Sequence, residues 1–121
     1  MAEGYAFNVS EAFARDPAGF ERMKAIAAEL PVALPVMLAQ LQAIAGHDTL
    51  DRLGAIDVPV LVVHGIEDRI LPVANAHLIA GAIAQARLEI FDGVGHLFWW
   101  EHPERSAELV RELAAGVGAA Q

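Results

Sequence analysis

The chain has 121 residues, of which 55% are hydrophobic, and a formal net charge of −8 at pH 7. This length fits one domain, and the negative charge argues against nucleic acid as a partner because the phosphate backbone selects Lys and Arg clusters. The lack of cysteine excludes disulfides and thiolate chemistry. Without a signal peptide or an apolar run of about 18 residues, we expect a cytoplasmic protein with no membrane partner.

The first 50 residues predict helices. Ser10 is a candidate N-cap, and Asp16-Pro17 places an N-cap Asp before a Pro at the first helical position. The helix that starts there is expected to run to about residue 29. A second helix is expected over about 35–45, where Gly46 ends it. Its spacing predicts four buried side chains, namely Val36, Leu38, Leu41 and Ile44.

Residues 51–121 predict a strand–helix–strand unit and a last helix. After a helical turn and a loop over 47–57, the apolar run 60–63 is typical of a strand covered on both faces. A helix over about 73–84 and a second strand over 86–91 follow, so the two strands should be parallel. The helix 73–84 is expected to turn Ala76, Leu78, Ile79 and Ile83 inward.

The chain after the second strand predicts a loop, an aromatic patch and a helix. Residues 92–95 are rich in glycine, residues 97–100 are Leu-Phe-Trp-Trp, and the last helix should begin near Pro103 and end near residue 115. Its expected inner face consists of Ala107, Val110, Leu113 and Ala114.

Two titratable residues, Asp68 and His96, each follow a predicted strand. Because parallel strands end at the same edge of a sheet, both side chains should lie on one rim, where ligands collect in α/β proteins. An Asp–His pair there suits general base catalysis, in which the carboxylate holds the imidazole tautomer. Asp68 is equally compatible with a turn that leads into the next helix, and Glu67 is an alternative acid.

Two segments carry a resemblance to a known family. Val60-Leu-Val-Val-His-Gly-Ile-Glu-Asp-Arg-Ile-Leu-Pro72 and Gly93-Val-Gly-His-Leu-Phe-Trp-Trp-Glu-His-Pro103 resemble the C-terminal half of an α/β-hydrolase-fold enzyme over about residues 35–115. The resemblance implies a partial α/β-hydrolase fold, with a parallel βαβ unit flanked by helices and completed by another chain. It implies a cap-like helical segment over 1–50 and a core fragment over 51–121, with Asp68 as the triad acid and His96 as the base.

The chain departs from that family at the nucleophile. The family order is nucleophile, acid, histidine, with the nucleophile on a G-x-S-x-G turn. The only serines are Ser10, which has no flanking glycine, and Ser106, which follows the histidine. The resemblance therefore implies a hydrolase that cleaves a small ester, lactone or related acyl compound in its complete form, and a chain that is inactive alone.

The partners follow from the same reasoning. A very apolar two-stranded sheet with an open edge should pair with a second copy of the chain or with a separate N-terminal hydrolase half. A non-catalytic oligomerisation or binding module is the alternative function. Phe98 and Trp99 are candidates for lining an acyl pocket or for packing the last helix. His64, Asp68 and His96 form a ligand set that iron or zinc accepts, but we expect no metal and no cofactor.

Overall fold

The computed structural model describes residues 2–119. Its elements in chain order are α1 (Ala2–Asn8), α2 (Glu11–Ala14), α3 (Pro17–Glu29), α4 (Leu34–Ala45), the 3-10 helix η1 (Leu50–Ala55), β1 (Val60–Gly65), α5 (Ala74–Ala82), β2 (Ala86–Phe91), α6 (Phe98–Glu101) and α7 (Pro103–Ala119). The predicted strands and the helices over 17–29, 35–45 and 73–84 are confirmed to within two residues at either end. The last helix is longer than predicted, and α1 and α6 were not predicted as helices.

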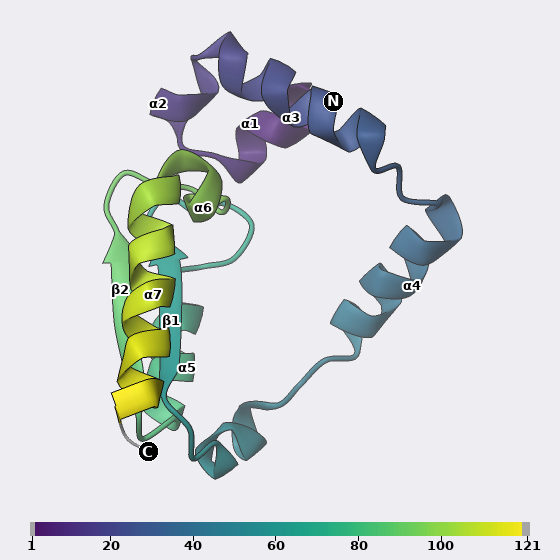
Figure 1. The fold of residues 1–121 in the computed structure, drawn as a ribbon. Coiled ribbons are helices and arrows are strands. Elements are labelled where there is room, and N and C mark those ends of the chain that lie inside the picture. The colour runs from purple at the N-terminus through teal and green to yellow at the C-terminus, as the bar shows by residue number, and fades with distance from the viewer. Residues whose placement is uncertain (1, 120–121) are drawn as a thin grey trace.

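The centre of the fold is a parallel pair of strands. β1 and β2 run in register from Val60 opposite Ala86 to Gly65 opposite Phe91. Figure 1 shows α7 in front of this sheet and α5 behind it, so each face has one covering helix. The predicted α/β class, with a βαβ unit flanked by helices, is confirmed.

The hydrophobic core is small and lies between β2 and α7. Phe91, Val94 and Leu109 are buried, and Leu61, Val63 and Phe98 pack against them. The predicted inner face of α7 is wrong at two positions, because Val110 is 63% exposed and Ala114 is also exposed, whereas Leu109 is 1% exposed. In α7 it is therefore Leu109, and not Val110, that faces the core.

The covering of α5 differs from the prediction in a similar way. Ala76 and Ile83 are buried as predicted, but Leu78 is 56% exposed and Ile79 is 38% exposed. These two side chains face η1 across an open hollow that also includes Leu53. They stay accessible because η1 is too short to cover the outer side of α5.

The N-terminal helices lie at the end of the sheet toward which both strands point, next to α6 (Figure 1). Val9 is fully buried there, and the Trp100 ring nitrogen donates a hydrogen bond to the Tyr5 hydroxyl at 3.2 Å. Both predicted caps are confirmed, since Ser10 accepts from the backbone of α2 and Asp16 from the backbone of α3. The N-terminal segment is thus part of the rim where the strands end.

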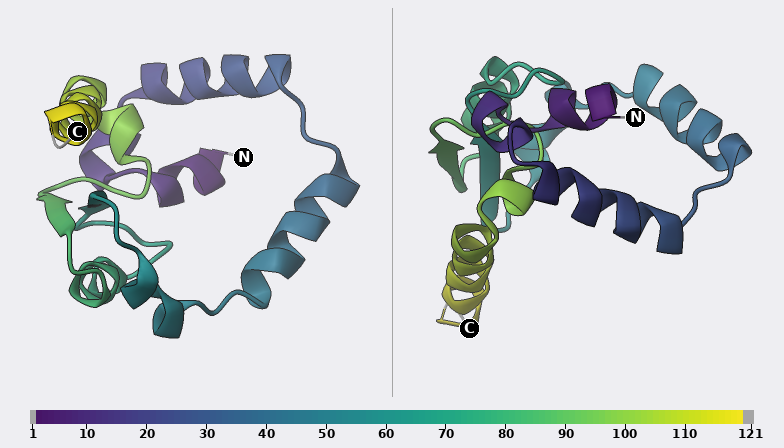
Figure 2. Two further views of the ribbon diagram at one scale, coloured as in Figure 1. Left: turned by 60° about the horizontal axis from the view of Figure 1, so that its bottom comes forward. Right: turned by 90° about the horizontal axis from the view of Figure 1, so that it is seen from above.

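Helix α4 stands apart from the βαβ unit, as both views in Figure 2 show. Every residue of α4 is exposed, so the predicted burial of Val36, Leu38, Leu41 and Ile44 is wrong in this structure. The reason is that no neighbouring element of the described chain covers its apolar side. No single helix within residues 2–119 has the length and hydropathy to cross a membrane, although α3 and α4 pass together as a pair bent by 110°.

Candidate active site

The candidate site lies in the two loops that follow β1 and β2. These loops are joined by backbone hydrogen bonds from Ile66 to Phe91 (2.9 Å) and from Glu67 to Val94 (2.8 Å). Gly65 is required at this junction, because a Cβ there would stand 2.3 Å from two carbonyl oxygens of the loop before His96. The close contact brings the acid-bearing loop and the histidine-bearing loop together.

Asp68 and His96 form a direct hydrogen bond. Asp68 Oδ2 lies 2.8 Å from His96 Nδ1, and the Asp68 side chain is only 3% exposed. The other carboxylate oxygen, Oδ1, accepts from the backbone N–H groups of Ile70 (2.8 Å) and Leu71 (2.9 Å). Asp68 therefore makes both kinds of contact that its position in the sequence suggested, because one oxygen closes the turn and the other contacts the histidine.

The environment of Asp68 favours its charged form. Burial alone would raise the pKa of the carboxyl group, but hydrogen bonds from Leu71, His96 and Ile70 outweigh it and hold the pKa below its ordinary value. A carboxylate is an acceptor only, so His96 must donate its Nδ1–H to it. The Nε2 atom of the neutral ring is then an acceptor, it has no hydrogen-bond partner among residues 2–119, and the His96 side chain is 29% exposed. This arrangement can accept a proton from a neighbouring hydroxyl group.

His64 is the third titratable side chain of the rim. Its Nε2 atom lies 3.0 Å from the Leu71 carbonyl oxygen and 3.2 Å from Asp68 Oδ2, which are both acceptors, so Nε2 carries the hydrogen. The Asp68 carboxylate is thus shared by two imidazoles. Within the described residues, no group of three or more His, Cys, Asp or Glu side chains has an arrangement that could hold a metal ion.

The alternative acid, Glu67, is exposed and lies beside Arg15 and Arg69 in a polar hollow. Among the described residues its carboxylate makes no hydrogen bond to His96, whereas Asp68 does. Of the two acidic residues, the structure therefore brings Asp68 and not Glu67 to the histidine.

The two predicted lining residues, Phe98 and Trp99, lie on α6. Phe98 packs edge-on against Phe91 with ring centroids 5.8 Å apart, and Trp99 is 49% exposed. Both line an apolar hollow of about 720 Å³ that extends over β1 and α7. Neither Asp68 nor His96 lines this hollow, so the structure does not place the aromatic pair and the Asp–His pair in one cavity.

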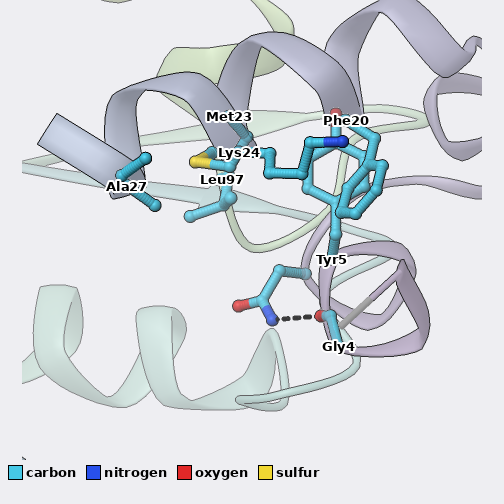
Figure 3. A pocket seen from close by; sticks show the side chains of 9 residues that line it. Gly4, Tyr5, Phe20, Met23, Lys24, Ala27 and Leu97 are labelled. Carbon is cyan, nitrogen blue, oxygen red and sulfur yellow. Dashed lines mark hydrogen bonds between the residues drawn. The ribbon is translucent and has the colours of Figure 1, made fainter. Parts of the chain in front are cut away.

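A second apolar cavity, of about 470 Å³, lies between α1 and α3 (Figure 3). Leu97, which directly follows His96, lines it together with Phe20, Met23 and Ala27 of α3. The Asn8 side chain at its edge donates to the Gly4 carbonyl oxygen at 2.8 Å. No local pattern in the sequence indicated this cavity, because Leu97 joins its wall from about 70 or more positions beyond α1 and α3.

The two serine hydroxyl groups of the chain are both engaged. Ser10 is 2% exposed, and its Oγ accepts from the Phe13 N–H while it lies 2.5 Å from a carboxylate oxygen of Glu101. Ser106 Oγ donates to the His102 carbonyl oxygen, one turn earlier, at 2.7 Å. The contact between Ser10 and Glu101 is a polar feature of the rim that no local pattern in the sequence indicated.

Comparisons of the sequence with known proteins point to one family. Residues 2–109 match the sequence profile of the alpha/beta hydrolase family. The pimeloyl-[acyl-carrier protein] methyl ester esterase of Aromatoleum aromaticum is 34% identical over 95 residues, which are 78% of this chain and 38% of that protein. The chain therefore spans about two-fifths of the length of this relative.

Solved structures show the same relationship. The structure of BpoC from Mycobacterium tuberculosis H37Rv matches with a TM-score of 0.81 at 23% identity, over 96% of this chain and 44% of that one. At that identity the likeness concerns the fold alone. An N-acyl homoserine lactone degrading enzyme matches with a TM-score of 0.66 at 33% identity, over 87% of this chain and 42% of the other.

Proposed function

Since this chain belongs to the alpha/beta hydrolase family, we propose that Asp68 and His96 are the acid and the base of a serine-type catalytic triad. The observation that carries this proposal is the 2.8 Å contact between Asp68 Oδ2 and His96 Nδ1. In such a triad the histidine takes the proton of the serine hydroxyl group and later gives it to the leaving group. The carboxylate orients the ring and stabilises the imidazolium ion that forms.

We assign the nucleophile to a segment outside these 121 residues. The only two serines are Ser10 and Ser106, and each hydroxyl group already has a partner within the chain. The Aromatoleum relative is longer, and about three-fifths of it has no counterpart in the match. The chain by itself should therefore lack hydrolytic activity that depends on His96.

The proposed substrate is a small, apolar ester, lactone or related acyl compound. The names of two similar proteins support this class, because one is a methyl ester esterase and the other degrades an N-acyl homoserine lactone. The cavity that includes Leu97 is lined largely by apolar side chains, which suits an acyl chain. Phe98 and Trp99 are proposed as a second apolar wall, which another segment would complete over β1.

The proposed partner is a nucleophile-bearing hydrolase segment, or a second copy of the chain in a homodimer. Within the described residues β1 pairs only with β2, so its other edge offers unpaired backbone groups to a further strand. The apolar side chains of α4 are also exposed. We expect this assembly to be cytoplasmic.

A second candidate function is a non-catalytic oligomerisation or binding module. The exposed apolar residues of α4, such as Leu38 (56%), Leu41 (56%) and Ile44 (69%), favour it, because an isolated chain gains nothing from exposing them. This candidate predicts a defined oligomer and no triad chemistry in any completed form. The two candidates are therefore separated by whether His96 matters for catalysis.

The first experiment measures turnover of p-nitrophenyl acetate by the chain alone and by its His96→Ala variant. Both are expected to match the background rate. The second experiment uses a chimera in which this chain replaces the matched part of the Aromatoleum esterase, so that the rest of the relative supplies the nucleophile. Methyl ester hydrolysis by this chimera should be lost on His96→Ala.

A matched control for the chimera is His77→Ala, because His77 is an exposed histidine on α5. Its rate should stay within twofold of the parent rate. A folded, active chimera whose rate is unchanged by His96→Ala would contradict the proposed role of the histidine. An active chimera that needs His96 would exclude the purely structural alternative.

A further inference from the structure

We propose that Glu101 is a positioning residue that fixes the His96 loop against the N-terminal segment. The proposal rests on the proposed function of His96 as a base, and it adds a residue that has no direct contact with the Asp–His pair. Glu101 lies at the end of the short helix α6, five positions after His96. Its effect on His96 would pass through Gly95.

The carboxylate of Glu101 joins two distant parts of the chain. Its Oε1 atom accepts from the backbone N–H of Gly95 (2.8 Å) and from that of Ser10 (3.0 Å). Its Oε2 atom accepts from the Ser10 hydroxyl group at 2.5 Å. Hydrogen bonds to a carboxylate are stronger than those between neutral groups, so Glu101 ties the residue before His96 firmly to Ser10.

The residue after His96 is tied to the same segment. The Leu97 N–H donates to the Asn8 carbonyl oxygen at 2.9 Å, so both neighbours of His96 are bound through residues 8–10. A Cβ on Gly95 would stand 2.5 Å from the Val9 carbonyl carbon, which shows how closely the two backbones approach. Val9 itself is fully buried. His96 is therefore bracketed by contacts to one buried segment.

The acid-bearing loop holds that segment from the other side. Arg69, which directly follows Asp68, donates to the carbonyl oxygens of Ala6 and, at 3.2 Å, of Val9. The segment 6–10 thus spans the loop of Asp68 and the loop of His96. Of these contacts only those of Glu101 involve a carboxylate, and their loss would release Gly95 from the segment 6–10.

The test reads the tautomer of His96 in the full chain. Histidine labelled with ¹⁵N reports by NMR whether the neutral ring carries its hydrogen on Nδ1 or on Nε2. The parent chain should show mainly the Nδ1–H form, which the contact with Asp68 requires. Glu101→Ala should lose this form as the major species, because Gly95 and Ser10 lose their common acceptor.

Two variants serve as controls. Glu101→Gln should keep the Nδ1–H form, because the amide oxygen can still accept from Gly95 and Ser10. Glu104→Ala removes an exposed carboxylate from the first turn of α7 and should leave the tautomer ratio unchanged. If Glu101 only stabilised the fold, Glu101→Ala would increase the unfolded fraction and leave the tautomer of His96 unchanged in the folded fraction. A change of tautomer in the folded chain therefore separates a positioning role from a purely stabilising one.

A folded Glu101→Ala chain with the parent ratio would overturn the proposal, as would a parent chain without the Nδ1–H form. If Glu101→Ala does not fold, Ser10→Ala decides, since it removes the 2.5 Å contact: a smaller Nδ1–H share supports the proposal and an unchanged share overturns it. The readout needs no hydrolysis. An inactive chimera would therefore count against the triad without touching this result.

Discussion

Asp68→Asn is the substitution that probes the candidate site most sharply. The side chain is 3% exposed, so its partners cannot be replaced by water without rearrangement. Asparagine keeps one oxygen for the N–H groups of Ile70 and Leu71, and the turn should survive. The second oxygen becomes an NH₂ group that faces the hydrogen-bearing nitrogens of His96 and His64. Donors then face donors, and His96 is driven to carry its hydrogen on Nε2.

The size of the effect follows from these contacts. A hydrogen bond to a charged group contributes about 1.5–3 kcal/mol, so the free energy of unfolding at neutral pH should fall by roughly 2 kcal/mol. The change of tautomer recovers part of the loss in stability but none in catalysis, because Nε2 can no longer accept a proton. In the chimera the rate should fall by about 10⁴-fold, the size seen when a triad aspartate is replaced by asparagine.

Urea unfolding followed by circular dichroism measures the first effect, with the exposed Asp92→Asn as the matched control. Since the pKa of folded Asp68 is lowered, its contribution is present above its ordinary pKa of 3.8 and is lost as the pH falls through the lower folded value. The parent and Asp68→Asn should therefore converge at acid pH. Equal stability at neutral pH, or a chimera rate within tenfold of the parent, would refute the reasoning.

Three further predictions concern packing and assembly. Gly65→Ala should destabilise the chain by about 3 kcal/mol or prevent folding, because its Cβ would clash with backbone oxygens at 2.3 Å. Its control is Gly81→Ala, where a Cβ meets open space. This substitution should stabilise α5 by about 0.5–1 kcal/mol in the same urea assay. Leu109→Ala should lower the free energy of unfolding by about 2–5 kcal/mol, because Leu109 is buried. Val110 is 63% exposed, so Val110→Ala should change this free energy by less than about 0.5 kcal/mol. If the partner is a second copy, light scattering at micromolar concentration should give a mass above that of the monomer, and Leu41→Lys on exposed α4 should lower this mass; a monomeric parent chain would contradict the proposed homodimer.

The elements of the fold could be predicted because their signals are local. The Asp16-Pro17 pair starts α3, the apolar run at 60–63 forms most of β1, and the alternating segment 86–91 forms β2. The positions of Asp68 and His96 just after these strands were enough to predict that the two side chains meet, because parallel strands end at one edge. The strand signals and the rule that parallel strands end at one edge were therefore sufficient to predict the contact between Asp68 and His96.

Burial was harder to predict, because it depends on what lies next to each face. The apolar spacing of α4 predicts a buried side, yet Ile44 is 69% exposed since no described element covers it. Val110 was predicted to be buried because it is apolar and at the right spacing, but it faces the open hollow over β1. Side chains at helical spacing tell which face is apolar, and not whether a neighbour exists.

Long-range polar contacts could not be predicted either, because they also depend on which elements lie next to each other. Glu101 binds Ser10 across 91 positions, and Trp100 binds Tyr5 across 95. Ser10 carried a signal as a helix cap, which is confirmed, but the cap pattern says nothing about its second partner. Such contacts depend on how the N-terminal segment packs on the rim.

The most direct test of the Asp68–His96 pair is the rate at which a fluorophosphonate labels the chimera, because this reagent reacts with a serine that a general base has activated. It needs no choice of substrate. We predict rapid labelling of the parent chimera, a loss of at least about 100-fold on His96→Ala, as expected when a general base is removed, and no change on His77→Ala. Equal labelling rates for the parent and His96→Ala chimeras would contradict the assignment of His96 as the base.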